Sequence, residues 1–199
     1  MIAVDEAHCV AQWGHDFRPD YRKMGALTEW FSHVPFIALT ATADRATRQD
    51  IIDKLQFHQP KIHVSSFDRP NIRYRVLEKS QPMKQLLTFL ESHQNLSGIV
   101  YALSRKRVEE VAEKLKDEGI NAKAYHAGLP AEIRHSVHQQ FIRDEVDIVV
   151  ATVAFGMGID KPNVRFVVHY DLPKNIEGYY QETGRAGRDG LASEALLLF

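Results

Sequence analysis

Several short groups of residues in this chain have types and spacing suited to phosphate and metal chemistry. The first is Asp5-Glu6-Ala7-His8, which directly follows the apolar run of residues 1–4. Such a run is typical of a buried parallel strand, and α/β folds place ligand chemistry at the carboxyl ends of these strands. Asp5 could therefore hold Mg²⁺, and Glu6 could polarise an attacking water. A solvated acidic loop is the more common explanation for such a pair taken alone.

The most specific string in the chain is Gln-Glu-Thr-Gly-Arg-Ala-Gly-Arg-Asp-Gly, residues 181–190. Its two arginines, Arg185 and Arg188, lie three residues apart, and each follows a glycine. The planar guanidinium pairs with phosphate oxygens, and an arginine finger can raise the rate of phosphoryl transfer roughly 10³- to 10⁵-fold. A solvated charged loop is the alternative, but the glycine spacing and the helix expected over residues 175–183 argue against it. Gln181 is assigned to the same site.

A glycine-containing loop follows the buried strand that the apolar run predicts over residues 146–152. Its glycines, Gly158 among them, would let backbone amides approach a phosphate chain. Asp160, at the end of this loop, could accept hydrogen bonds from a ribose. A Gly-x-Gly loop taken alone is weak evidence.

Two aromatic residues, a histidine and an arginine fall within eight residues just after the acidic pair: Trp13, His15, Phe17 and Arg18. Exposed aromatics beside an arginine form a stacking platform for unpaired bases, worth roughly 1–3 kcal/mol per base. Core packing of the two aromatic rings is the alternative. The glycine, proline and charges around them favour a loop.

Small hydroxyl residues, Thr40 and Thr42, end the strand expected over residues 36–40. They could couple an ATP site to a DNA site. Alternatively, Thr42 or Asp44 could cap the helix expected over residues 45–55. The segment alone leaves both explanations open.

The elements that must position these groups are short apolar strands alternating with amphipathic helices. This alternation predicts an α/β fold of parallel sheets covered by helices. Helices are also expected between Ser104 and Gly119 and around residues 133–141. Turn residues at 68–71 predict a boundary, with one domain over 1–66, a linker over 67–70 and a second domain over 71–199. The remaining expected strands cover residues 1–4, 62–67, 98–103, 122–126, 164–170 and 195–199.

The composition sets broad limits on the class of protein. Hydrophobic residues make up 44% of the 199, enough for a core, and the net charge of −1 gives no global basic field. Cys9 is the only cysteine, which excludes an internal disulfide framework and a cysteine-based zinc site and fits a reducing compartment. The sequence shows neither a membrane-spanning run nor a signal peptide, so we expect a cytoplasmic protein without a membrane partner. Both ends fall inside expected strands, which predicts a fragment of a longer protein.

Taken together, these groups resemble superfamily 2 helicases, and the resemblance is close to the bacterial RecQ family. Residues 5–8 resemble the DEAH box, residues 13–18 its aromatic-rich loop, and residues 40–42 its Thr-Ala-Thr motif. Residues 66–71 resemble the passage into the second RecA-like domain. Later motifs are matched by residues 125–129, by the loop that ends at Asp160 and by residues 181–190. The aromatic loop directly after DEAH, combined with residues 181–190, is the most selective part of the match.

The resemblance implies the C-terminal part of a first RecA-like domain followed by a second RecA-like domain. It also implies a 3′→5′ DNA helicase acting in recombination and repair, with ATP and Mg²⁺ as cofactors and single- and double-stranded DNA as partners. Glu6 would be the catalytic base, Asp5 the Mg²⁺ ligand, and Arg188 the arginine finger beside Arg185. The implied DNA contacts are Trp13, His15, Phe17, Arg18, Ser104, His126 and Thr152. The implied coupling residues are His8, Thr40 and Thr42.

The departures from the family pattern are large. Nowhere does the sequence contain G-x-x-x-x-G-K-[ST], the loop that holds the β- and γ-phosphates, and the family's glutamine motif, zinc-binding segment and winged helix are missing as well. We therefore expect the isolated polypeptide neither to hydrolyse ATP nor to unwind DNA, and to bind no zinc. Two alternatives remain: an RNA helicase of the DEAD-box class, which DEAH and the aromatic loop argue against, and a non-catalytic module that binds nucleic acid or protein.

Overall fold

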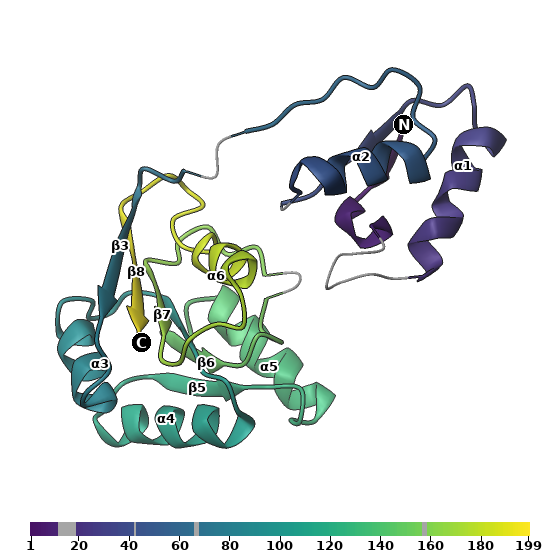
Figure 1. Ribbon diagram of the computed structural model, residues 1–199. Coiled ribbons are helices and arrows are strands. Elements are labelled where there is room, and N and C mark those ends of the chain that lie inside the picture. The colour runs from purple at the N-terminus through teal and green to yellow at the C-terminus, as the bar shows by residue number, and fades with distance from the viewer. Residues whose placement is uncertain (12–18, 42, 66–67, 157–158) are drawn as a thin grey trace. The chain divides into compact units, whose positions relative to one another are not determined.

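A computed structural model of the chain describes residues 1–11, 19–41, 43–65, 68–156 and 159–199 (Figure 1). It divides into two compact units, Met1–Phe67 and Asp68–Phe199. Some residues with an expected functional role lie outside the described parts of the chain: the ligand contacts Trp13, His15, Phe17, Arg18 and Gly158 and the coupling residue Thr42.

The first unit contains a two-stranded parallel sheet, in which Val4 is paired with Ala38. The segments that follow the two strands therefore leave the sheet at the same edge. Val4 packs with Ile51 and Leu55 in a small core. The elements are β1 (Ile2–Val4), the 3₁₀ helices η1 (Ala7–Val10) and η2 (Pro19–Met24), α1 (Gly25–Trp30), β2 (Phe36–Ala38) and α2 (Arg45–Lys54).

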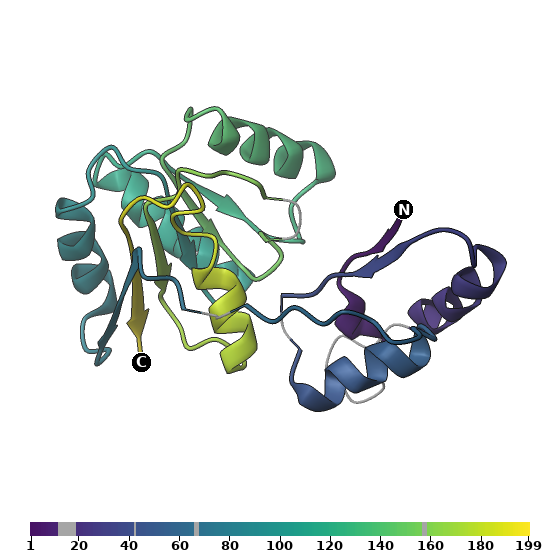
Figure 2. The same cartoon turned by 90° about the horizontal axis from the view of Figure 1, so that it is seen from above.

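The second unit is built on a six-stranded sheet with the order β3-β8-β7-β4-β6-β5, in which all neighbours are parallel (Figure 2). Connections between parallel strands must cross from one end of the sheet to the other, and most of these contain a helix. The elements are β3 (Ile72–Leu77), α3 (Pro82–Glu91), β4 (Gly98–Tyr101), α4 (Arg105–Asp117), β5 (Ala122–Tyr125), α5 (Ala131–Ile142), β6 (Ile148–Ala151), β7 (Phe166–His169), α6 (Ile176–Thr183) and β8 (Ser193–Leu198).

Helices cover both faces of this sheet. Leu86 of α3 and Leu115 of α4 pack with Val100 on one face. On the other face, Phe141 of α5 packs with Ile99. Consecutive residues of β4 thus pack into the cores on opposite faces of the sheet, as the alternation of side chains along a strand requires. The expected α/β class of parallel sheets flanked by helices is confirmed.

Two of the expectations for individual elements need correction. Residues 62–65 form no strand: Ile62 and Val64 are 58% and 61% exposed, and apolar alternation without a pairing strand does not make a sheet. Conversely, β3 was not expected, because Arg73 and Arg75 interrupt its apolar pattern. As an edge strand that pairs only with β8, β3 can carry exposed charges.

An ion pair ties the segment after α5 to the segment after the glycine loop. Lys161 Nζ lies 2.6 Å from Asp144 Oδ1, and the Lys161 side chain is only 1% exposed. The hydrogen bond from Lys161 holds the pKa of Asp144 below its ordinary value; burial acts in the opposite direction, and a hydrogen bond from Ser97 adds to the lowering. A carboxyl whose pKa is lowered on folding stabilises the protein above its unfolded pKa of about 4, and this contribution is lost as the pH falls through the folded value.

We therefore expect Asp144→Asn to lower the free energy of unfolding at pH 7 by about 1 kcal/mol, because the buried Lys161 ammonium loses its anionic partner while solvent screens the half-exposed carboxylate. The difference from the unsubstituted chain should shrink as the pH falls below about 4, because the unfolded carboxyl is protonated there and the folded one follows as the pH falls through its lower pKa. Urea unfolding at pH 7 and pH 3 measures both values. An equal difference at the two pH values would contradict the assigned role of the carboxylate charge.

Candidate functional site

The acidic pair lies where β1 ends. The Glu6 N–H donates to Asp5 Oδ1 at 2.8 Å, and Glu6 has a left-handed backbone with φ 49°. Left-handed backbone is uncommon for residues other than glycine and costs about 1–3 kcal/mol, so it is concentrated at functional sites. Both carboxylates are exposed and project from a short turn between β1 and η1.

His8 and Thr40 come together at the same edge of the small sheet. His8 Nδ1 lies 2.8 Å from Thr40 Oγ1 and 3.4 Å from Glu6 Oε2. His8 is buried, whereas half of the Glu6 side chain is exposed. Because β1 and β2 run in parallel, the segment after β2 reaches the segment after β1, and one imidazole contacts both. This contact joins two of the three residues expected to couple an ATP site to a DNA site.

In the second unit, the two arginines reach the glycine loop after β6. Arg185 Nη1 donates to the Gly156 carbonyl. Arg188 Nη1 donates to the Ile159 carbonyl at 2.8 Å and to Asp160 Oδ1 at 3.2 Å. The structure thus brings Arg185, Arg188 and Asp160 into one place. Gln181 lies half-buried in α6, one turn before Arg185.

The arginine-bearing loop is held from the start of the second unit, by residues that the sequence assigned only to the passage between the domains. Arg69 Nη2 donates to the Gly187 carbonyl at 2.9 Å, and Asn71 Nδ2 donates to the same carbonyl at 2.9 Å. Gly187 has φ 57°, and a Cβ there would lie 2.5 Å from Asn71 Nδ2, so this close contact requires glycine. The one sequence feature that could have indicated this contact is Pro70, whose ring restricts the backbone between Arg69 and Asn71.

The expected DNA contacts lie at the carboxyl ends of three adjacent strands, since Ser104 follows β4, His126 follows β5 and Thr152 follows β6. Ser104 is exposed and caps α4, because its side chain accepts a hydrogen bond from the Arg107 N–H at 3.2 Å. Thr152 is half-buried, and its N–H donates to the Tyr125 carbonyl at 3.2 Å.

His126 differs from the other two, because its ring is buried, with Nε2 3.0 Å from Glu109 Oε1. The buried His126 ring is therefore not exposed to an outside ligand. A missed feature of the same edge is the exposed cationic first turn of α4, formed by Arg105, Lys106 and Arg107. The sequence could have indicated this feature, because three consecutive cationic residues follow directly after an expected strand.

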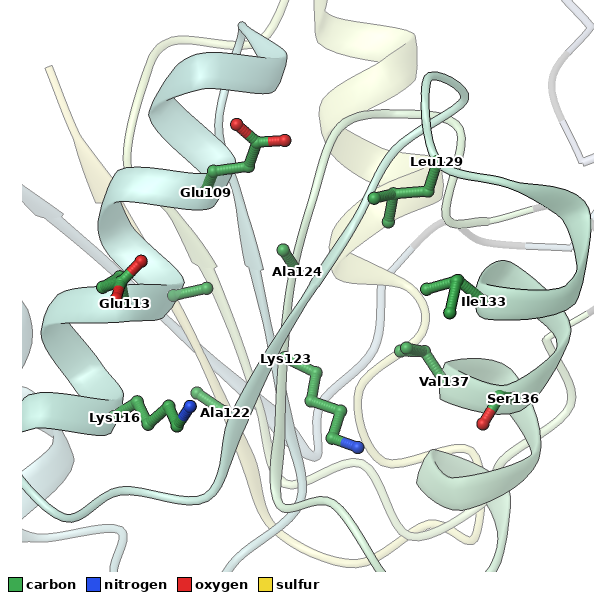
Figure 3. Close-up of a pocket in the computed structure, with 11 residues that line it drawn as sticks. Glu109, Glu113, Lys116, Ala122, Lys123, Ala124, Leu129, Ile133, Ser136 and Val137 are labelled. Atoms are coloured by element: carbon green, nitrogen blue, oxygen red, sulfur yellow. The ribbon is translucent and has the colours of Figure 1, made fainter.

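A groove of about 390 Å³ lies at the free edge of the sheet, between α4, β5 and α5 (Figure 3). Its lining is mainly apolar, with Ile133 and Val137 facing the alanines of β5 and Glu113 and Lys116 on α4. None of the residues expected to contact ligands lines it. The groove is therefore distinct from the arginine–glycine-loop site.

Two further findings concern metals and membranes. Within the described ranges, no group of three or more His, Cys, Asp or Glu side chains is arranged to hold a metal ion. A nucleotide-bound Mg²⁺ needs no such group, since it takes one or two protein carboxylates and completes its shell with phosphates and water. The exposed Asp5 fits that requirement. In the same described ranges, no helix is both long and apolar enough to cross a membrane.

Comparison with known proteins places the chain among helicases. Residues 78–190, more than half of the chain, match the family described as Helicase conserved C-terminal domain. The ATP-dependent DNA helicase RecQ of Pasteurella multocida is 58% identical over all 199 residues, which make up 32% of that protein. The RecQ-like DNA helicase BLM of Xenopus laevis is 50% identical over 203 residues, covering all of this chain and 15% of that protein. The chain thus spans about a third or less of the length of these relatives.

Solved structures support the fold. The S. cerevisiae protein Dbp5 bound to RNA and ADP BeF3 matches 99% of this chain and 52% of its own, with a TM-score of 0.78 and 21% identity. At that identity the match speaks for the fold alone, whereas the identity to RecQ proteins extends over every motif described above. The chain belongs to the helicases with this conserved C-terminal domain and, among them, to the RecQ family.

Proposed function

We propose that these residues form the part of an ATP-dependent 3′→5′ DNA helicase that completes the ATP site and contacts DNA, coupling hydrolysis to unwinding in recombination and repair. The observation that supports the proposal is that Arg185 and Arg188 both donate hydrogen bonds to the loop that ends at Asp160. The names of the RecQ relatives supply DNA as the substrate. Residues 1–66 would belong to a first RecA-like domain, 67–70 to a linker and 71–199 to a second. We also propose a cytoplasmic location, in keeping with a single buried thiol.

Each side chain has a chemical task in this proposal. Asp5 would hold Mg²⁺, which neutralises phosphate charge, and Glu6 would accept the proton of the attacking water. Arg188 would stabilise the negative charge that develops on the transferred phosphoryl group. Both of the bonds that it makes to the described residues use Nη1, so the guanidinium keeps further donors for a phosphate oxygen. Asp160 would accept hydrogen bonds from the ribose.

The DNA backbone would lie across the carboxyl ends of β4, β6 and β5. Ser104 and Thr152 offer hydroxyl and backbone groups there, and the cationic first turn of α4 supplies positive charge. Trp13, Phe17 and Arg18, with His15 between them, would stack on unpaired bases. Coupling of the two sites would run through His8 and Thr40, which are 2.8 Å apart, and through Thr42.

A chimera tests this proposal: these 199 residues replace the matching segment of the Pasteurella multocida RecQ helicase. We expect the chain alone to release no phosphate from ATP, because the loop that holds the β- and γ-phosphates is missing from its sequence. The RecQ chimera should show DNA-stimulated ATP hydrolysis and should unwind a duplex with a 3′ tail but not one with a 5′ tail.

The alternatives give different results in the same assays. A RecQ chimera that folds and binds DNA without hydrolysing ATP would support the non-catalytic binding module. Stimulation by RNA in place of DNA would support the DEAD-box class. Hydrolysis by the 199-residue chain alone would contradict the inactivity that we propose for it.

A further inference from the structure

We propose that Glu182 is a positioning residue for the two arginines: its buried carboxylate, held by His169, fixes the end of α6 from which the arginine-bearing loop starts. This inference rests on the function proposed above. It assigns a task to two buried polar side chains that contact no phosphate themselves.

The pair lies inside the second unit. His169, the last residue of β7, is 1% exposed, and Glu182, in the last turn of α6, is 7% exposed. His169 Nε2 and Glu182 Oε2 are 2.6 Å apart. The Glu182 carbonyl accepts a hydrogen bond from the Arg185 N–H at 3.3 Å. The side chain of Glu182 therefore anchors α6 to the sheet, while its backbone is bonded to the first arginine.

A second path of contacts leads from the same histidine to the glycine loop. The His169 ring stacks on the Tyr101 ring, with the centroids 5.5 Å apart and the planes 27° apart. Tyr101 donates its hydroxyl hydrogen to the Phe155 carbonyl at 2.8 Å. The next carbonyl, that of Gly156, accepts the Arg185 guanidinium. The contacts thus form a closed path, which leads from the Arg185 N–H through Glu182, His169 and Tyr101 to the glycine loop and back to the Arg185 guanidinium.

The unpaired ring nitrogen of His169 favours one tautomer of the imidazole. His169 Nδ1 is buried and has no hydrogen-bond partner among the described residues. A protonated imidazole would leave a buried N–H donor unpaired there, which costs about 1–3 kcal/mol. The tautomer with its only hydrogen on Nε2 donates to Glu182 Oε2 and leaves the Nδ1 lone pair, but no N–H donor, unpaired. Burial raises the pKa of Tyr101 above its usual range, so the phenol remains a donor.

Charged groups from both parts of this contact path act on the Tyr101 phenol. Arg185 lowers the pKa of Tyr101, against the effect of burial, whereas Glu182 raises it. Both charges therefore act on the same buried ring. Removal of the carboxylate charge would weaken the contact between Glu182 and His169 that holds the end of α6, and the position of Arg185 on Gly156 would be less well defined.

The test uses the RecQ chimera with Glu182→Gln, which keeps the size of the side chain and removes its charge. We expect kcat for DNA-stimulated ATP hydrolysis to fall roughly 10- to 100-fold, since small misplacements of catalytic groups can lower rates by about this much. The KM for ATP and the Tm should change little. Glu118→Gln, the same change at an exposed residue just after α4, is the matched control and should leave kcat unchanged.

Tyr101→Phe provides a second variant, because it keeps the ring and removes only the bond to the Phe155 carbonyl. If both side chains act through the same loop, the losses in the double variant should be smaller than the product of the single losses. Unchanged kcat in Glu182→Gln would overturn the proposal. So would a loss of kcat accompanied by equal losses of DNA affinity and Tm, which would show a merely structural role.

A further measurement does not depend on activity. Arg185 Nε is buried, so its hydrogen should exchange slowly with solvent in the ¹⁵N spectrum of the 199-residue chain and faster after Glu182→Gln. Equal exchange in both would overturn the positioning role even if the chimera were inactive. An inactive unsubstituted chimera would count against the proposed function alone, which keeps the two failures distinct.

Discussion

Replacing Arg188 by alanine in the RecQ chimera should lower kcat for DNA-stimulated ATP hydrolysis by about 10³-fold or more, the range of an arginine finger. The side chain is 37% exposed and is bonded through Nη1 to the Ile159 carbonyl and Asp160 Oδ1. Its contribution would be made to charge that develops only during phosphoryl transfer, so the KM for ATP should change far less than kcat. Phosphate release at several ATP concentrations separates the two constants.

Arg188→Lys distinguishes charge from geometry. Lysine keeps the positive charge but loses the planar fork that pairs with phosphate oxygens, so we expect most of the loss to remain. Arg143→Ala, at an exposed residue just after α5, controls for the removal of an arginine. Activity of Arg188→Ala within about threefold of the unsubstituted chimera would rule out the finger, because an arginine finger is worth far more. A matching loss in Arg143→Ala would point to general charge instead.

The sequence predicted the fold best where one physical signal was sufficient. The central strands β4, β6 and β7 are buried on both faces; β4 and β6 read as continuous apolar runs, and β7 does so up to His169. The edge strand β3 has no such signal, because two of its residues are arginines. The alternating residues 62–65 have the pattern of a strand without a partner. Strand pairing depends on the whole fold. The apolar pattern alone therefore missed β3 and predicted a strand at residues 62–65 that does not form.

The candidate site shows the same limit. Residue types and spacing singled out Glu6 and Arg188 as candidates for phosphate chemistry and Asp160 as a candidate for contact with a ribose. The residues that hold these groups gave no comparable signal. Arg69 bonds a carbonyl 115 residues away, at Gly184, and Glu182 meets His169 from another element. Such contacts are set by the strand order, which brings distant segments together, and only the structure shows them.

Glu6→Gln should lower kcat of the RecQ chimera by about 10²- to 10⁴-fold, the usual contribution of a general base. The amide keeps the size of the side chain but cannot accept the proton of the attacking water. Because the left-handed backbone of Glu6 is retained, the turn after β1 should not change, and neither should nucleotide binding. Phosphate release and the binding of a fluorescent nucleotide measure the two effects separately.

The position of Glu6 allows a finer test of the base. Its Oε2 lies 3.4 Å from His8 Nδ1, so an exposed acid is held beside a buried imidazole that also contacts Thr40. Glu6→Asp keeps the carboxylate but withdraws it by one methylene, and it should retain more activity than Glu6→Gln if proton transfer is the task. Glu29→Gln, at an exposed residue of α1, is the matched control. Equal activity of Glu6→Gln and Glu29→Gln would rule out Glu6 as the general base. Equal losses of activity in Glu6→Asp and Glu6→Gln would show that Glu6 orients the water and that the length of its side chain is essential.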